Sequence, residues 1–459
     1  MMTRLITSER WLILKQRLLH YLNIDLDEHW LLLKTLVKWM ILGSLAGIGA
    51  GTASAIFLTS LQWATDTRLA HPEIILFLPL AGLLIGWIYH RFAGTASRGN
   101  HLVIEEVNLN RSRIPLRMAP LVLVGTVLTH LFGGSAGREG TAIQMGASLA
   151  DGLRRVLRLN PVDRRLILLA GISGGFGSVF GTPIAGFVFG MEVHKIGRIR
   201  YEGVIPCLVA SLVGDLVTRL WGVTHSHYPA LASYEIDPAL ILKMSIAGIG
   251  FGLTSLLFVE MIHLIKKVSR RYIAYAPLRL AVGGMILLVL TALIGSLDYL
   301  GLSLPLIRAS LDGTGVVTFA FLLKLIFTTL TLGTGFLGGE VTPLFVIGST
   351  LGFTLARLLG VDTALMASVG FVAVFAGASN TPLACILMGV ELFGGGGLLY
   401  LGIGCFVAYL VSGHRGIYPT QVISTPKIPD TGTQAGESLE AFATRRLENG
   451  NERASGGSE

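Results

Sequence analysis

Long apolar segments separated by short polar breaks constrain the fold of this chain more than any other feature. Hydrophobic residues make up 52% of the 459 positions and charged residues only 14%, which is too apolar for a soluble domain of this size. Leu31–Trp63 and Leu240–Ile265 are long enough to cross a bilayer at a tilt, whereas other segments fall well below the ~20 residues that a spanning helix needs. We therefore predict an all-α, polytopic protein of the lipid bilayer with half-helices that end inside the protein.

The basic residues gather in a few loops, which predicts the topology. Their clusters lie at residues 91–117, 154–165, 195–200 and 266–279. The loops poor in Lys and Arg are 65–73, 225–237 and 296–306. Because Lys and Arg favour cytoplasmic loops, we place the second set outside and both termini in the cytoplasm, in a multi-pass protein of the inner membrane. The net charge of +8 is thus a topology signal, and no nucleic-acid partner is expected.

A glycine-rich stretch, Gly133–Thr141, places Glu139 at the start of the apolar segment Ala142–Leu153. Ionisable groups at membrane depth are costly and usually functional. Broken backbone is tolerated there only where it is buried in protein or lines a cavity, and helix N-termini that face such a cavity attract anions. We predict that the carboxylate of Glu139 competes with a transported anion for one position.

An internal repeat indicates that the chain contains two copies of one helical unit. Thr182–Glu192 recurs without a gap as Thr381–Glu391, and Gly137–Thr141 recurs as Gly338–Thr342. Repeats of this kind place substrate sites where their broken helices converge near the midplane.

The repeat gives the predicted domain organisation. We assign residues 31–223 to the first membrane repeat and residues 238–420 to the second. Residues 1–30 mix charges with Leu and Trp, which favours a cytoplasmic amphipathic helix at the membrane surface. Residues 425–459 are rich in Gly, Ser, Thr and Glu, which is typical of a disordered cytoplasmic tail.

Four short motifs together resemble the CLC family of chloride channels and proton-coupled anion exchangers, over the chain from about Leu31 to Tyr418. These motifs are Gly99–Val103, Gly137–Gly140, Gly338–Pro343 and Gly416–Pro419. The resemblance implies two inverted-topology repeats with broken and re-entrant half-helices, and a homodimer with an independent pore in each subunit. No cofactor is expected.

The resemblance also implies roles for individual residues. Glu139 is similar to the family's external gate, and Tyr418 matches a tyrosine whose hydroxyl faces the central anion. The expected anion-binding residues are Asn100, Gly137, Gly140, Thr342 and Tyr418. The expected supporting residues are Arg138, Thr141, Glu340 and Val341.

Departures from the family's common motifs resemble its fluoride-specific branch, whose members exchange fluoride for protons. Asn100 stands where a serine is usual, and Thr141 where a proline is usual. Glu340–Thr342 replaces two apolar residues and a small one. The internal proton-relay glutamate of the chloride exchangers aligns with Val193, which cannot carry a proton. The resemblance therefore does not determine the route that protons take.

The chemistry of fluoride gives a physical reason for these substitutions. Fluoride is small and strongly hydrated, so a site must replace its water with strong, converging hydrogen-bond donors. The Asn100 amide, the hydroxyls of Thr342 and Tyr418, and backbone N–H groups at half-helix starts supply such donors. Protonated Glu139 withdraws and carries a proton, and Glu340 either orients donors, binds a cation or moves protons.

Two alternatives remain open. Within the same family, a chloride channel or chloride/proton exchanger is the rival to a fluoride/proton antiporter that exports fluoride. From another class, Gly133–Gly137 formally matches the Gly-x-Ser-x-Gly pattern of serine hydrolases, with His130 nearby. That elbow needs a preceding strand, whereas the preceding residues predict a helix, so we expect a transporter and not an enzyme.

Overall fold

The computed structural model describes residues 26–428 and 435–455, which are mainly helical. The chain divides into two compact units, Met1–Leu42 and Gly43–Glu459. In the first unit, residues 26–42 form the start of helix α2 (Leu26–Ala70), and most of its large apolar side chains are exposed. The predicted amphipathic segment 1–30 falls almost wholly outside the described residues.

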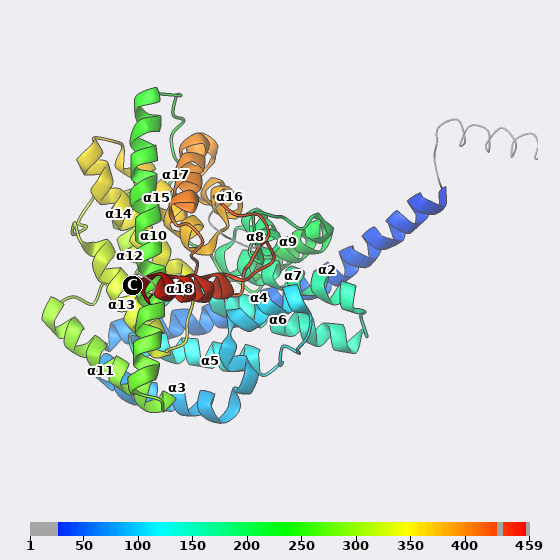
Figure 1. Ribbon diagram of the computed structural model, residues 1–459, viewed down its shortest axis with the longest axis horizontal. Helices are drawn as coiled ribbons and strands as arrows, with labels where there is room; N and C mark the ends of the chain where they lie inside the picture. Colours follow the sequence, from blue (N-terminus) through cyan, green and yellow to red (C-terminus); the bar gives the residue numbers. More distant parts are fainter. Residues whose placement is uncertain (1–25, 429–434, 456–459) are drawn as a thin grey trace, which may run out of the picture. The chain divides into compact units, whose positions relative to one another are not determined.

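The helices of the larger unit form two successive sets, one in each half of the chain. After the rest of α2, the first half contains α3 (Leu78–Phe92), α4 (Asn100–Leu109), α5 (Met118–Leu131), α6 (Glu139–Val156), α7 (Pro161–Phe180), α8 (Pro183–Glu192) and α9 (Val204–Leu220). The second half contains α10 (Pro238–Tyr272), α11 (Ala276–Ile294), α12 (Leu304–Leu311), α13 (Ala320–Thr334), α14 (Val341–Leu359), α15 (Thr363–Ser379), α16 (Pro382–Phe393) and α17 (Leu398–Val411). Helices α4–α9 and α12–α17 lie in two neighbouring groups (Figure 1). Short elements complete the unit: η1 (Pro72–Phe77), η2 (Gly94–Arg98), η3 (Tyr201–Gly203), η4 (Gly395–Gly397), β1 (Lys195–Ile196), β2 (Val422–Ile423) and α18 (Leu439–Ser455).

Local sequence signals explain where several helices begin and end. The side chains of Asn160, Asp237 and Asp362 accept backbone N–H groups at the starts of α7, α10 and α15, as N-cap residues do. Helices α7 and α14 end at Gly181 and Gly360, whose φ angles are 73° and 61°. Glycine adopts this left-handed conformation without steric cost.

The helix lengths agree with a broken-helix membrane protein. Six helices in the described part of the chain are long and apolar enough to cross a bilayer, among them α2 and α10, which cover the two long apolar segments of the sequence. Others, such as α4 and α8 with 10 residues each, are too short to span. The prediction of an all-α polytopic fold with half-helices is confirmed.

Glycine pairs let the core helices approach closely in both halves. A Cβ atom on Gly146 of α6 would lie 2.2 Å from the carbonyl oxygen of Gly171 on α7, and one on Gly348 of α14 would lie 2.0 Å from that of Gly370 on α15. Small residues allow such backbone contact between membrane helices. The same device therefore holds the corresponding helix pair in each half.

A reciprocal pair of glutamates joins α8 to α16. Glu192, at the end of α8, accepts the backbone N–H groups of Leu383 and Ala384 at 3.2 and 2.9 Å. Glu391, near the end of α16, accepts those of Ile184 and Ala185 at 2.9 and 2.7 Å. Because the end of each helix meets the start of the other, the two helices run antiparallel, and each carboxylate satisfies N–H groups that a helix start leaves unpaired.

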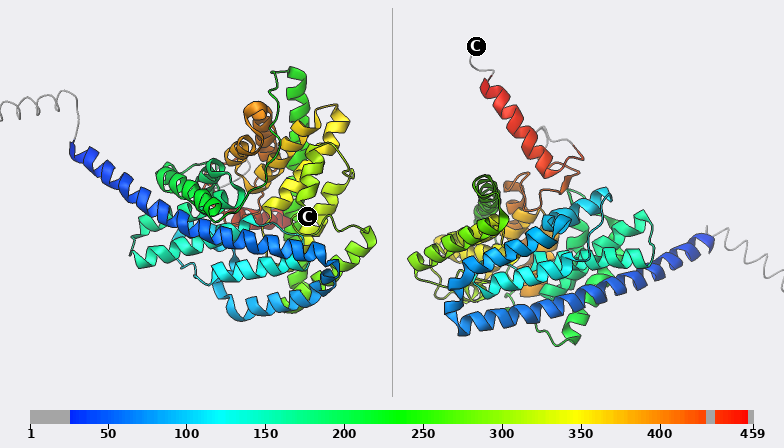
Figure 2. Two further views of the ribbon diagram at one scale, coloured as in Figure 1. Left: turned by 180° about the vertical axis from the view of Figure 1, so that it is seen from behind. Right: turned by 90° about the horizontal axis from the view of Figure 1, so that it is seen from below.

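The C-terminal segment corrects one prediction. Residues 425–459 were predicted to be disordered, but the described part of this segment contains helix α18, which extends away from the other helices (Figure 2). Leu439 and Phe442 of α18 are buried with Ile196 and Ile423, and the Leu439 N–H donates to the Gln421 carbonyl at 3.0 Å. The composition of the segment did not indicate this helix, because only two buried apolar side chains, Leu439 and Phe442, dock it.

Candidate functional site

The two glycine-rich breaks meet at the centre of the larger unit. The Gly137 N–H donates to the Gly339 carbonyl at 2.6 Å, and the Gly339 N–H donates to the Gly137 carbonyl at 2.8 Å. Helices α6 and α14 therefore begin beside one another, as the repeat predicted. The Gly137 N–H is engaged in this bond, and the anion-binding role of Gly137 stays a prediction.

The carboxylate of Glu139 lies at the N-terminus of the partner half-helix. One of its oxygens accepts the backbone N–H groups of Thr342 and Arg138 at 3.0 and 3.1 Å. The other accepts the Thr342 hydroxyl and lies 3.5 Å from the Arg138 Nε atom. Glu139 is fully buried. A negatively charged group thus occupies a helix N-terminus that attracts anions.

Three buried polar atoms near this carboxylate have no hydrogen-bond partner among the described residues. They are Asn100 Oδ1, Glu340 Oε2 and the Tyr418 hydroxyl. Buried polar groups are normally paired. The unpaired Tyr418 hydroxyl can donate to an anion, whereas Asn100 Oδ1 and the Glu340 carboxylate oxygen accept a hydrogen bond or a proton.

Gly140 explains how these groups come so close. A Cβ atom at Gly140 would lie 2.8 Å from Asn100 Nδ2, 3.2 Å from the Gly339 Cα atom and 3.6 Å from Glu340 Oε2. Only glycine leaves room for the three to converge. The predicted residues Asn100, Gly140 and Glu340 are therefore brought together.

A cavity of about 680 Å³ leads to this cluster. Asn100, Gln144, Gly338 and Glu340 are among its lining residues. Its basic lining comes from the loops that the sequence assigns to the cytoplasm, with Arg98, Lys266, Arg270 and Arg279. Apart from Glu340, the charged residues that line this cavity are basic. A predominantly basic lining concentrates anions.

The remaining predicted residues have supporting positions. The Thr141 and Thr126 hydroxyls lie 2.7 Å apart, which ties α6 to α5 and directs Thr141 away from the carboxylate of Glu139. Val341 is fully buried at the first position of α14. Val193, at the position of the chloride exchangers' relay glutamate, is buried, and its carbonyl accepts the Gln421 side chain at 2.7 Å.

The geometry excludes the serine hydrolase alternative. The Ser135 hydroxyl lies 2.9 Å from the Thr328 hydroxyl and accepts the Lys324 ammonium at 2.9 Å. The ring nitrogens of His130 instead bond the carbonyls of Thr126 and Ala136. Since Ser135 has no histidine to take its proton and follows a helix instead of a strand, the Gly-x-Ser-x-Gly match is a coincidence of composition.

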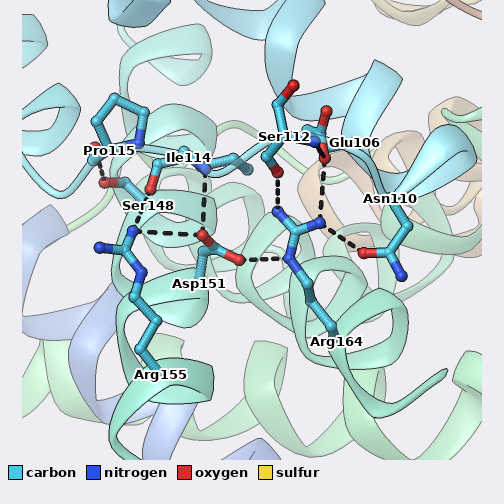
Figure 3. Close-up of polar contacts among 9 residues, drawn as sticks. All are labelled: Glu106, Asn110, Ser112, Ile114, Pro115, Ser148, Asp151, Arg155 and Arg164. Atoms are coloured by element: carbon cyan, nitrogen blue, oxygen red, sulfur yellow. Dashed lines mark hydrogen bonds and ion pairs between the residues drawn. The ribbon is translucent and has the colours of Figure 1, made fainter. Parts of the chain in front are cut away.

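An ion-pair network holds the helix that carries Asn100. Arg164 of α7 donates to Asp151 Oδ1 at 2.6 Å and to Glu106 Oε2 at 3.1 Å. It also bonds Asn110 Oδ1 and the Ser112 carbonyl in the segment after α4 (Figure 3). The buried guanidinium of Arg164 is paired with two carboxylates, and further N–H groups of it donate to the other two oxygens. Removing one partner would leave a buried charge uncompensated, which is costly. The network fixes α4 against α6 and α7.

Sequence reasoning missed Lys324, Gln144 and the role of Arg164. Lys324 is a fully buried lysine inside an apolar segment, and an ionisable residue in such a segment is itself a signal. Arg164 was assigned to a basic loop because its carboxylate partners lie far away in the sequence. Gln144 had no signal, since only the fold directs it into the cavity.

Comparisons with known proteins agree with this geometry. A family model described as voltage gated chloride channel matches residues 81–413. A chloride/fluoride channel protein of Pseudomonas syringae pv. tomato is 48% identical over 402 residues, which cover 86% of this chain and 89% of the relative. An H(+)/Cl(-) exchange transporter, ClcA, of Vibrio cholerae is 26% identical over 398 residues, which cover 78% of this chain and 82% of that relative.

Solved structures share the fold. The crystal structure of a CLC-type fluoride/proton antiporter is 35% identical, with a TM-score of 0.82 over 84% of this chain and 98% of that chain. A slow cyanobacterial Cl-/H+ antiporter is 21% identical, with a TM-score of 0.70 over 90% of this chain and 97% of that chain, and supports the fold alone. With its two glycine-rich breaks joined around a buried carboxylate, this integral, multi-pass membrane protein belongs to the CLC family of anion channels and transporters.

Proposed function

We propose that this protein is a fluoride/proton antiporter that exports fluoride. The observation that carries the proposal is the position of Glu139, whose carboxylate accepts the backbone N–H and the hydroxyl of Thr342 at the N-terminus of α14 and the backbone N–H of Arg138. Fluoride needs the same kind of strong, converging donors. A carboxylate that leaves this position when it is protonated exposes those donors to fluoride, so proton uptake and anion binding are coupled.

Asn100 and Tyr418 complete the anion position in this proposal. Both are buried; the Tyr418 hydroxyl has no hydrogen-bond partner among the described residues, and the Asn100 Nδ2 atom lies against Gly140 beside Glu139. Dehydrated fluoride accepts the Asn100 amide N–H and the Tyr418 O–H. The relative named as a chloride/fluoride channel protein and the solved fluoride/proton antiporter support this selectivity.

Glu340 is the second proton-carrying group in the proposal. It is partly buried and directly precedes α14, its buried Oε2 atom has no partner among the described residues, and it lines the basic cavity. A charged carboxylate repels a neighbouring anion, so Glu340 acts while it is neutral or exchanging a proton. This role would replace the relay that Val193 lacks.

We further infer a homodimer with one pore in each subunit, in the inner membrane with both termini in the cytoplasm. The resemblance in the signature motifs supports the dimer. The placement of basic clusters in the loops supports the orientation.

Reconstitution into liposomes with parallel fluoride, chloride and proton flux measurements tests the proposal. We expect fluoride efflux to exceed chloride efflux and to drive protons inward. Equal fluoride and chloride fluxes would favour the rival chloride exchanger. Fluoride efflux without proton movement would favour a channel.

A further inference from the structure

A second, smaller cavity lies against the loops that the sequence places outside. Its volume is about 320 Å³, and Thr65, Arg68, Leu69, Arg138 and Ser303 are among its lining residues. Its walls come from the segments 58–69 and 297–306 and from Arg138, whereas the larger basic cavity lies against segments assigned to the cytoplasm. Arg138 connects the smaller cavity to Glu139, since the Arg138 Nε atom lies 3.5 Å from the carboxylate.

Arg68 is a buried cation with no acceptor in the described structure. Arg68 is only 9% exposed, and its Nη1 atom has no hydrogen-bond partner among the described residues. Gly301, with φ of 61°, makes room for the guanidinium, because a Cβ atom there would lie 2.6 Å from Nη1. A buried charge without a partner carries a large desolvation cost, so the arginine requires an explanation other than stability.

Charged groups of both signs surround the cavity near Arg68. The Lys324 ammonium lies behind the wall, where it donates to the Ser303 hydroxyl at 2.8 Å and to the Gly301 carbonyl at 2.7 Å. Two carboxylates, Asp66 and Asp298, also line the cavity but are exposed. Since water and salt screen exposed charges more than buried ones, the interior favours an anion despite this acidic rim.

We propose that this cavity is an anion-binding antechamber, in which Arg68 and Arg138 hold a small inorganic anion on the external side of Glu139. Taking fluoride as that anion rests on the proposed function. The anion reaches or leaves the central position when Glu139 moves, and Arg68 keeps it near the gate in the meantime. This arrangement gives Arg68 the counter-charge that the protein itself does not supply.

Charged thiol reagents test the antechamber without relying on fluoride transport. Leu69 lines the cavity and is 67% exposed, so the full-length Leu69→Cys variant presents a reactive thiol there, while Cys207, Cys385 and Cys405 are buried. We expect an anionic methanethiosulfonate to react faster than a cationic one, and Arg68→Gln to lower this rate ratio about tenfold. Arg68→Lys should retain most of the ratio. Arg357→Gln, which removes an exposed arginine outside the cavity, should retain all of it.

An unchanged ratio in Arg68→Gln would overturn the proposal. Should that variant fail to fold, fluoride protection of Leu69→Cys with Arg68 intact decides instead, because a bound anion must slow the anionic reagent. No slowing at any concentration of fluoride or of chloride would equally overturn it, whereas slowing by chloride alone would reject only fluoride as the anion.

Fluoride flux separates this inference from the proposed function. In liposomes, Arg68→Gln should raise the half-saturating external fluoride concentration about tenfold, with Arg357→Gln unchanged. A wild-type protein that moves no fluoride, yet shows the Arg68-dependent reagent ratio, would retain the antechamber and reject fluoride as its anion. A changed ratio with an unchanged half-saturation would overturn the antechamber's place on the transport path.

Discussion

The two halves of this protein place a glutamate at the same break, yet the two carboxylates have different surroundings. Glu139 reaches across to α14 and accepts three hydrogen bonds, two of them from Thr342. Glu340 is only partly buried, and its buried Oε2 atom has no partner in the described structure. A repeated backbone therefore does not repeat its chemistry, because the side chains next to each break decide which carboxylate is held and which stays available for a proton.

The threonines after the two glutamates show the same divergence. Thr342 donates to Glu139, whereas the Thr141 hydroxyl pairs with Thr126 on the neighbouring helix α5. One threonine is therefore part of the anion position and the other is part of the scaffold. Substitutions at paired positions can test whether this asymmetry is functional.

The largest effect is expected for Glu139→Gln. An amide cannot carry a proton, so fluoride-driven proton movement in liposomes should fall about 100-fold, the scale of a lost proton-transfer group. The exposed Glu28→Gln serves as a control for loss of an acidic residue. Proton coupling that survives in Glu139→Gln would remove the basis for the comparison.

Glu340→Gln should reduce proton movement about tenfold, at the lower end of the losses expected for a proton-transfer group, and should leave more fluoride flux than Glu139→Gln does. The physical reason is that Glu340 relays protons without occupying the anion position. Parallel fluoride and proton fluxes measure this. If both fluxes fell together, Glu340 would be part of the anion position instead.

Thr342→Val should weaken fluoride binding roughly fivefold, the loss of one hydrogen bond to a buried acceptor. Thr141→Val, its partner in the other half, should leave fluoride affinity unchanged and lower the melting temperature. Isothermal titration with fluoride and thermal unfolding in detergent provide the two measurements. Equal effects on affinity would show that the halves are functionally symmetric.

The smallest effects are expected at the reciprocal caps of α8 and α16. Glu192→Gln should cost about 1–2 kcal/mol, because it loses charge-assisted bonds to backbone N–H groups in a buried position. Glu391→Gln should cost less, since Glu391 is only half-buried. Thermal unfolding of both variants checks the order, and fluoride flux through the folded protein should be unchanged in each. A reversed order would mean that burial does not set the strength of these caps.

Much of the fold was predictable because the bilayer leaves few choices. Three features together predicted a repeated, broken-helix membrane protein. They are apolar segments too short to span a bilayer, basic loops and the recurrence of Thr182–Glu192. The tail was predicted wrongly, since its docking depends on Leu439 and Phe442 meeting Ile196 and Ile423. Those contacts join distant parts of the chain and leave no local pattern.

The sequence by itself determined the class of protein and the identity of its central carboxylate, because an acidic residue in a glycine-rich break of an apolar segment is too costly to be incidental. Only the tertiary structure decided what each group contacts. It directed Glu139 to Thr342, paired Thr141 with Thr126, and buried Arg68 beside Gly301 without an acceptor. The reason is that hydrogen bonds and charges act over a few ångströms, and helix packing alone decides which side chains come that close.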